Sequence, residues 1–336
     1  MIFAFDWGTV IEQTLQAGFG SEAAVYALAA IGLNIHFGYA GLLNFGQVGF
    51  MAVGGYGVGI TVHYFEGSFW AGLFVGILFA VVLALILGLP TLRLRADYLA
   101  IVTIAAAEII RILVRSVWAS PVTRGAQGIS GFADAFYDIN PFDDPRARYG
   151  FGPVKFLAND AWITLIGWIV VALSVLFVWQ LMRSPWGRVV RAVREDEDAA
   201  RALGKNAYWY KLQALMIGGV FGGIAGIVQV VSKQTVQPDT FVPPITFFVW
   251  TALILGGVGR VLSPVVGAML FWALLALTDN VLRQLVRDDA IPEALLEVAQ
   301  IGQIRFMLAG LGLILLMIFR PQGIFGSRRE MLLDDR

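Results

Sequence analysis

The sequence contains no cysteine, so the chain has no disulfide, no thiolate nucleophile and no cysteine-ligated metal site. It has only two histidines, His36 and His63, and neither belongs to a metal-binding pattern. No G-x-x-x-x-G-K-[ST] phosphate loop is present, so this chain does not itself bind ATP in that manner. We therefore expect no metal, no cofactor and no catalytic residue, and we do not expect an enzyme.

Charge is also scarce. Only 14% of the 336 residues are charged and 58% are hydrophobic, whereas a soluble domain carries about 25% charged residues. The formal net charge is zero, which gives no reason to expect a nucleic-acid partner. The apolar runs predict an all-α integral membrane protein, a single transmembrane domain over residues 1–336, with about nine (8–10) crossings of the lipid bilayer.

Basic residues are absent from the start of the chain, where Arg93 is the first. Three acidic residues precede the first apolar runs without any basic neighbour: Asp6, Glu12 and Glu22. Because cytoplasmic flanks are enriched in Lys and Arg, this pattern predicts an external N-terminus. Arg93 and Arg95 then mark the inside, and Arg328 and Arg329 predict a cytoplasmic C-terminus.

Glycine is dense in residues 38–59, where Asn44 and Gln47 lie among apolar residues. Irregular backbone survives at membrane depth only when protein or a water-filled cavity surrounds it, so we expect a broken or re-entrant helix here. A second interrupted segment, 245–268, strengthens the likeness to the discontinuous helices of transporters. Polar groups at this depth need a function, so Asn44 and Gln47 are predicted to line the solute pathway.

Glu108 and Arg111 lie three residues apart in the apolar run 97–118, on neighbouring faces of a helix. They are expected to face each other, together with protein or water, because a charge in the bilayer is costly. The pair is either a structural ion pair that fixes helix packing or part of the solute pathway, with Glu108 as the pathway residue. The acidic, glycine-containing segment 119–160 that follows is predicted to be an external loop.

The most charged stretch, residues 184–211, interrupts the apolar sequence near its middle. Ser184 is a good N-cap, Pro185 suits the first helical position, and Gly204 suits a left-handed helix end. Apolar residues recur between them at roughly helical spacing: Val189, Val190, Val193, Ala200 and Leu203. The stretch is thus predicted to be one short amphipathic helix on the cytoplasmic side. It is either a solvated loop or a docking helix for a soluble partner.

Five segments, in the same order over nearly the whole chain, resemble a known family: GLNIHFGYAGLLNFGQVGFMAVGGY (32–56), LRLRADYLAIVTIAAAEIIRIL (92–113), SPWGRVVRAVREDEDAARALG (184–204), LGGVGRVLSPVVGA (255–268) and FRPQGIFG (319–326). They are similar to the LivM-like membrane subunits of branched-chain amino acid ABC importers. The segment TRGAQGISG (123–131) resembles the family's T-G-G-P-N-G-I-x-G stretch, with Arg124, Ala126 and Gln127 departing from it.

The resemblance implies a permease of the bacterial inner membrane with four kinds of partner. These are the lipid bilayer, a second LivH-like permease, two cytoplasmic ATPase subunits and an external substrate-binding protein. The stretch from Asp198 to Gly204 is similar to the E-A-A-x-x-x-G loop that contacts the ATPase in such importers, with Asp in place of Glu. The expected coupling residues are Arg194, Glu197, Asp198, Ala199, Ala200 and Gly204.

On this resemblance we expect import of leucine, isoleucine and valine, with ATP hydrolysis on separate subunits. One alternative keeps the architecture and changes the cargo to urea, short amides or other amino acids. Another is an ion-coupled secondary transporter that uses Glu108 as a proton or sodium site.

Overall fold

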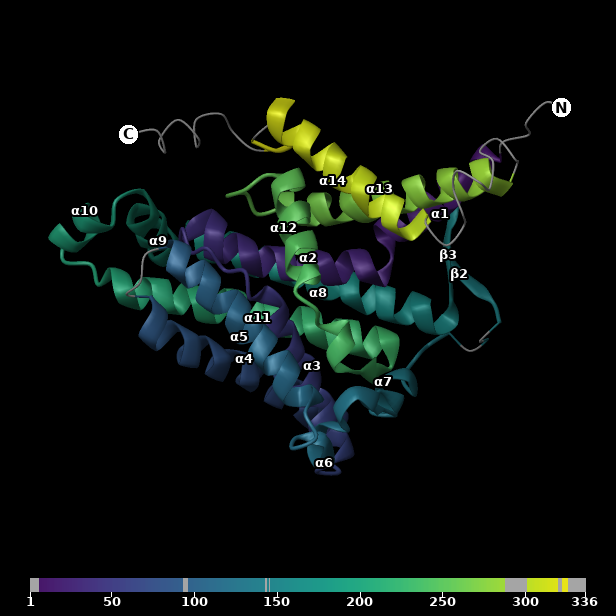
Figure 1. Cartoon of the computed structure of the whole chain (residues 1–336), viewed down its shortest axis with the longest axis horizontal. Helices are drawn as coiled ribbons and strands as arrows, with labels where there is room; N and C mark the ends of the chain where they lie inside the picture. The colour runs from purple at the N-terminus through teal and green to yellow at the C-terminus, as the bar shows by residue number, and fades with distance from the viewer. Residues whose placement is uncertain are drawn as a thin grey trace.

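The computed structural model describes residues 6–92, 96–142, 144, 146–287, 301–319 and 322–325. Long α-helices dominate these residues, and the strands form only two short two-stranded sheets (Figure 1). The prediction of an all-α architecture is confirmed.

Four helices make the centre of the molecule: α2 (Ser21–Leu33), α3 (Gln47–His63), α4 (Phe69–Thr91) and α11 (Ala207–Lys233). Helix α11 packs against the other three, and every residue of α2 from Ala23 to Leu33 is buried. Glycines allow this close approach, since a β-carbon at Gly226 would overlap the carbonyl oxygen of Met51 in α3. The core is therefore held by backbone-to-backbone contact as well as by side-chain packing.

The helical path breaks between α2 and α3. A π-helix, η1 (Asn34–Tyr39), follows α2 directly, and residues 40–46 are not helical. Most of this break is buried, and its backbone groups are bonded by side chains of other elements, including Thr103 Oγ1 to the Phe45 N–H (3.0 Å). An irregular segment can be stable at this depth because its polar groups have partners within the protein.

The remaining long helices surround this centre: α1 (Trp7–Phe19), α5 (Ala96–Arg115), α8 (Ala158–Arg183), α12 (Pro244–Gly256), α13 (Ser263–Arg287) and α14 (Ile301–Phe319). Six stretches of the described residues are long and apolar enough to cross a membrane: Trp7–Tyr39, Phe69–Thr91, Ala158–Arg183, Ala207–Lys233, Pro238–Gly256 and Ser263–Val286. The chain is thus a multi-pass membrane protein. The larger number of about nine crossings stays a prediction.

Short elements occupy the predicted external loop 119–160: α6 (Ser120–Thr123), η2 (Gly125–Gln127), β1 (Ile129–Ser130), α7 (Asp134–Tyr137), β2 (Arg148–Phe151) and β3 (Val154–Leu157). Strand β1 pairs with β4 (Thr235–Val236), which the 3-10 turn η3 (Pro238–Thr240) follows, while β2 and β3 form a hairpin. The β1–β4 pairing anchors the loop to the end of α11.

The charged stretch forms two helices, α9 (Pro185–Glu195) and α10 (Glu197–Ala202), so the prediction of one continuous helix is wrong. Asp196 has an extended backbone (φ −153°, ψ 104°), and its side chain accepts the Ala199 N–H at 2.9 Å. An aspartate that caps a new helix competes with continuation of the old one, which explains the break. Leu203, expected on the apolar stripe, is 80% exposed, whereas Val190, Val193 and Ala200 are buried as predicted.

Some topology markers lie outside the described residues: Arg93, Arg95, Arg328 and Arg329. The orientation that they predict is taken up below as a proposal.

Candidate functional site

The α9–α10 pair projects from one end of the molecule, seen at the left of Figure 1. Ser184 caps α9 by accepting the Gly187 N–H at 3.4 Å, and Asn206 caps α11 by accepting the Trp209 N–H at 3.3 Å. Gly204 ends the pair with φ +75°, the left-handed conformation expected from the sequence. Three capped helix ends in a short stretch give the projection a defined shape.

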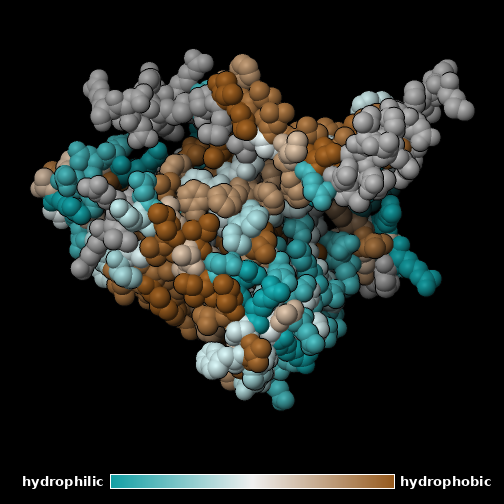
Figure 2. Space-filling model, viewed as in Figure 1, coloured by the Kyte–Doolittle hydropathy of each residue, from teal (hydrophilic) through white to brown (hydrophobic). Residues whose placement is uncertain are grey.

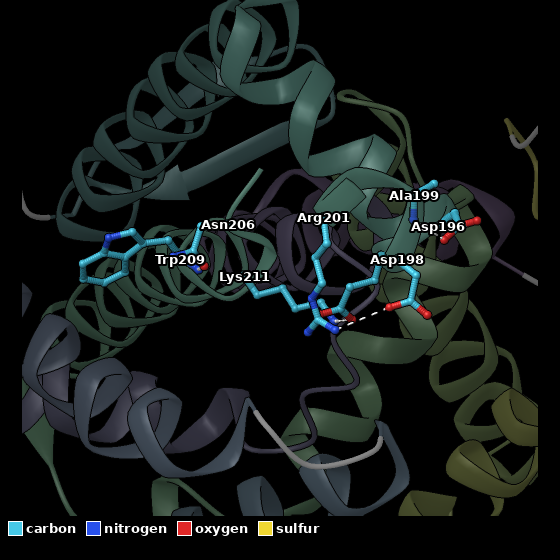
Figure 3. Close-up of polar contacts among 8 residues, drawn as sticks. Asp196, Asp198, Ala199, Arg201, Asn206, Trp209 and Lys211 are labelled. Atoms are coloured by element: carbon cyan, nitrogen blue, oxygen red, sulfur yellow. Dashed lines mark hydrogen bonds and ion pairs between the residues drawn. The ribbon is translucent and has the colours of Figure 1, made fainter. Parts of the chain in front are cut away.

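Glu197 joins α10 to the membrane helix that follows. Its carboxylate forms ion pairs with Arg201, at 2.7 Å, and with Lys211 of α11. Figure 3 shows Arg201 and Lys211 extending toward the acidic residues of α10, while Asp196 lies beside Ala199. The Asp198 side chain, by contrast, is 93% exposed, and its ion pair with Arg201 is long, at 3.4 Å. Glu197 therefore fixes α10, whereas Asp198 is left open at the surface.

Arg194 connects this projection to the broken segment. Its Nη1 donates to the carbonyl oxygen of Gly38, in η1, at 2.5 Å. The Cγ of Arg194 would lie 3.2 Å from a β-carbon at Gly41, so the arginine stem also packs against the break. A displacement of α9 would thus act directly on η1 and on residues 40–46.

A buried polar cluster holds the other side of the break. His36, Asn44 and Gln47 are fully buried. The Asn44 amide nitrogen donates to His36 Nδ1 and to Gln47 Oε1, both at 3.0 Å. His36 Nε2 donates to the Leu215 carbonyl oxygen at 3.0 Å. Gln47 Nε2 in turn donates to the carbonyl oxygens of Ala29 (3.2 Å) and Gly218 (3.4 Å). With Nδ1 accepting and Nε2 donating, His36 is a neutral imidazole of defined tautomer.

Asn34 ties η1 to the turn between α12 and α13. Its Nδ2 donates to the Arg260 carbonyl oxygen at 2.8 Å, and its Oδ1 accepts the Gly259 N–H at 2.9 Å. This turn belongs to the second interrupted segment predicted from the sequence. The two interrupted segments are therefore joined by one asparagine, and α9 contacts the first of them through Arg194.

Glu108 lies elsewhere, on α5. Its carboxylate bonds to Arg111 at 2.5 and 2.9 Å, so the prediction that the two residues face each other is confirmed. Arg111 Nη1 also lies 3.4 Å from Asp239 Oδ1 in η3, and Arg115 Nη1 lies 3.1 Å from the same atom. These four side chains, called here the α5 charge cluster, combine two cations with two anions. The structure does not bring Glu108 together with Asn44 and Gln47.

Sequence reasoning missed several of these residues. His36 was considered only as a metal ligand, and Asn34, Asp239 and Arg115 were given no role. Each is a polar residue within or beside an apolar run, which is the signal that could have marked it. Their partners are distant in sequence, 226 residues away for Asn34 and Arg260, and no local pattern identifies such pairs.

These features define a polytopic α-helical membrane protein with a capped helix pair at one end and buried interrupted helices. Residues 18–317 match the family described as the permease component of the branched-chain amino acid transport system. The chain belongs to this family, and it is a membrane permease component.

Three similar proteins carry the same kind of name. The high-affinity branched-chain amino acid transport system permease protein LivM of Escherichia coli K12 is 34% identical over 316 residues, covering 92% of this chain and 69% of that protein. LivM of Salmonella typhimurium LT2 is 32% identical, covering 99% and 75%. The probable branched-chain amino acid transport permease protein LivM of Methanocaldococcus jannaschii is 28% identical, covering 90% and 91%.

Proposed function

We propose that this permease moves leucine, isoleucine and valine into the cytoplasm, driven by ATP hydrolysis on separate ATPase subunits. The family match over residues 18–317 and the names of the similar LivM proteins support this cargo. The chain carries no phosphate loop of its own, which agrees with ATP hydrolysis on separate subunits.

The proposed partners are a second LivH-like permease, two cytoplasmic ATPase subunits and an external substrate-binding protein. The α9–α10 projection is the surface proposed to contact an ATPase, with Arg194, Glu197, Asp198, Ala199, Ala200 and Gly204 as coupling residues. In support, Asp198 and Leu203 are strongly exposed at the tip of this projection. The ion pair of Glu197 with Lys211 attaches the tip to α11.

We propose a cytoplasmic α9–α10, a cytoplasmic C-terminus and an external N-terminus, in a bacterial inner membrane. Figure 1 supports opposite sides for the two polar regions, because α9–α10 lies at one end of α8 and the β2–β3 hairpin lies at the other. The excess of acidic residues near the N-terminus and in 119–160 agrees with an external location for both.

The observation that carries the coupling proposal is the hydrogen bond from Arg194 to Gly38 at 2.5 Å. A shift of the ATPase would move α9, and Arg194 would pass this motion to η1. From η1 the motion would reach the turn at 257–260 through Asn34 and the core of α11 through His36. Irregular segments can change their backbone angles more easily than regular helices, which suits a hinge in alternating access.

The solute-pathway residues Asn44, Gln47 and Glu108 also remain a proposal, and the structure supports them unequally. The amides of Asn44 and Gln47 are closed off by protein partners, so any contact with solute would need the break to open. The Glu108 side chain is 33% exposed and accessible as it stands.

Purification of the tagged chain in mild detergent, with identification of co-purifying proteins by mass spectrometry, tests the assembly. We expect a second permease and P-loop ATPases in the complex. Recovery of the chain alone, in a preparation that still transports without ATP, would contradict the proposal.

A further inference from the structure

Helix α5 differs from α4 and α8 in what its exposed face carries. The large side chains most exposed on α4 and α8 are apolar, among them Phe74 and Ile86 on α4 and Leu173 on α8. Such faces suit lipid. The exposed face of α5 also has isoleucines, such as Ile101 and Ile112, but Glu108 lies between them.

The apolar run 97–118 predicts that α5 spans the bilayer, where ionised groups face protein or water, so the one-third exposed Glu108 does not face hydrocarbon. Figure 1 shows α5 on the front of the molecule, without another helix over it. In Figure 2 the same region has hydrophilic side chains directly beside an apolar area. Either the proposed second permease or an aqueous space lies against this face of α5, and the thiol-labelling experiment below distinguishes the two.

The α5 charge cluster has the chemistry of an amino-acid head group. Glu108 and Asp239 are anions, Arg111 and Arg115 are cations, and the two arginines share one oxygen of Asp239. The solute carboxylate would meet the guanidinium groups that the carboxylates of the cluster meet now, and the solute ammonium would meet a carboxylate. One turn beyond Glu108, the exposed Ile112 offers an apolar surface on the same face of the helix.

We propose that the α5 charge cluster is the point in the solute pathway where the permease contacts the head group of a zwitterionic α-amino acid. The solute ammonium pairs with Glu108, the solute carboxylate pairs with Arg111 and Arg115, and the aliphatic side chain lies over Ile112. This inference rests on the proposed function and specifies the residues that act on its solute.

The internal pairs give the site a property that transport requires. When the head group enters, the Glu108–Arg111 pair opens and two pairs with the solute form, so the loss of the internal pair offsets part of the gain. When the head group leaves, the internal pair closes again. Because the internal pair competes with the solute, the site binds the head group weakly and releases it readily. Charged side chains without such a pair would bind the head group more tightly.

The absence of cysteine allows a direct test by thiol labelling in the assembled importer in membrane vesicles. The variant Ile112→Cys places a thiol beside the cluster, and Ile86→Cys on α4 is the matched control at a similarly exposed isoleucine, 63% against 55%. We expect a charged, water-soluble methanethiosulfonate to modify Ile112→Cys at least about tenfold faster, because thiolate forms only where water reaches the thiol. Equal, slow labelling of the two variants would overturn the aqueous α5 face.

The head-group contact is tested by uptake and by photolabelling. Glu108→Gln should lower leucine uptake by at least about tenfold at unchanged complex assembly and ATP hydrolysis. The control Asp279→Asn, which weakens the pairs of Asp279 with Arg283 on α13 and with Arg305 on α14, should have a small effect. In the unmodified complex, a diazirine analogue of leucine should label α5 near Ile112. Leucine uptake by that complex without α5 labelling would overturn this inference alone, and no leucine uptake at all would overturn the proposed function.

Discussion

Arg194 in α9 donates a hydrogen bond to the carbonyl oxygen of Gly38 at 2.5 Å, across 156 residues of sequence. This bond joins the charged helix pair to the buried break between α2 and α3. Because the bond ends on backbone, a displacement of α9 would act on the main chain of η1 and not only on a side chain.

Loss of this bond should uncouple ATP hydrolysis from uptake. In the reconstituted complex, Arg194→Gln is expected to reduce leucine uptake about tenfold, the order expected for a hydrogen bond with a charged donor, while ATP hydrolysis continues. The control is Arg188→Gln, in the same helix, whose guanidinium bonds to the Arg183 carbonyl oxygen at 3.2 Å and not to the break. Equal effects of the two variants on the ratio of uptake to hydrolysis would contradict the role of Arg194.

The left-handed end of α10 should tolerate only certain residues. Gly204 has φ +75° and open space around its α-carbon, so backbone strain alone decides the outcome. Gly204→Val is expected to cost about 1–2 kcal/mol locally and to lower coupled uptake. Gly204→Asn should stay near the unmodified protein, because asparagine accepts this conformation. Wild-type uptake by Gly204→Val, at normal expression, would count against the defined tip.

Two neighbouring aspartates should separate structure from docking. Asp196→Ala removes the cap of α10, costs about 1 kcal/mol, and should speed amide hydrogen exchange within residues 197–202. Asp198→Ala, at a 93% exposed side chain, should leave exchange unchanged and weaken retention of the ATPase. Hydrogen exchange by mass spectrometry, with co-purification of the ATPase, measures both. The assignment fails if Asp198→Ala, rather than Asp196→Ala, increases exchange.

The buried cluster around the break should contribute strongly to stability. Asn44→Ala leaves His36 Nδ1, Gln47 Oε1 and the Gly46 N–H without partners. Each buried unsatisfied group costs about 1–3 kcal/mol, so the thermal midpoint in detergent should fall clearly. Asn159→Ala is the control, because the exposed Asn159 side chain bonds to Asn140, itself half-buried at the surface, and not to the break. A similar midpoint for both variants would show that the cluster is not holding the break.

The sequence predicted what local chemistry controls. Ser184, Gly204 and the Glu108–Arg111 pair have the predicted geometry, because caps, left-handed ends and i,i+3 pairs depend on neighbours in the chain. The break at Asp196 was missed because an aspartate cap and a continuous helix are both compatible with the same apolar spacing.

Contacts between distant residues could not be predicted. Arg194 was expected to contact an ATPase, yet its guanidinium reaches Gly38, and Asp239 of η3 completes a charge cluster on α5. Such partners are selected by the packing of whole helices, and a single sequence contains no signal that pairs them. Buried amides illustrate the same limit, since Asn44 and Gln47 were recognised as unusual but their bonds to His36, Ala29 and Gly218 were not.

Uptake of labelled leucine by proteoliposomes that contain the purified complex and its binding protein tests the central claim most directly. ATP is supplied on the side of the membrane that carries the ATPase subunits, and no ion gradient is imposed. We predict uptake that requires ATP, is unaffected by a protonophore, and is reduced by unlabelled isoleucine and valine but not by urea or short amides. Uptake that fails with ATP alone, and that appears without ATP when a proton or sodium gradient is imposed, would contradict the account and would make Glu108 an ion-coupling residue.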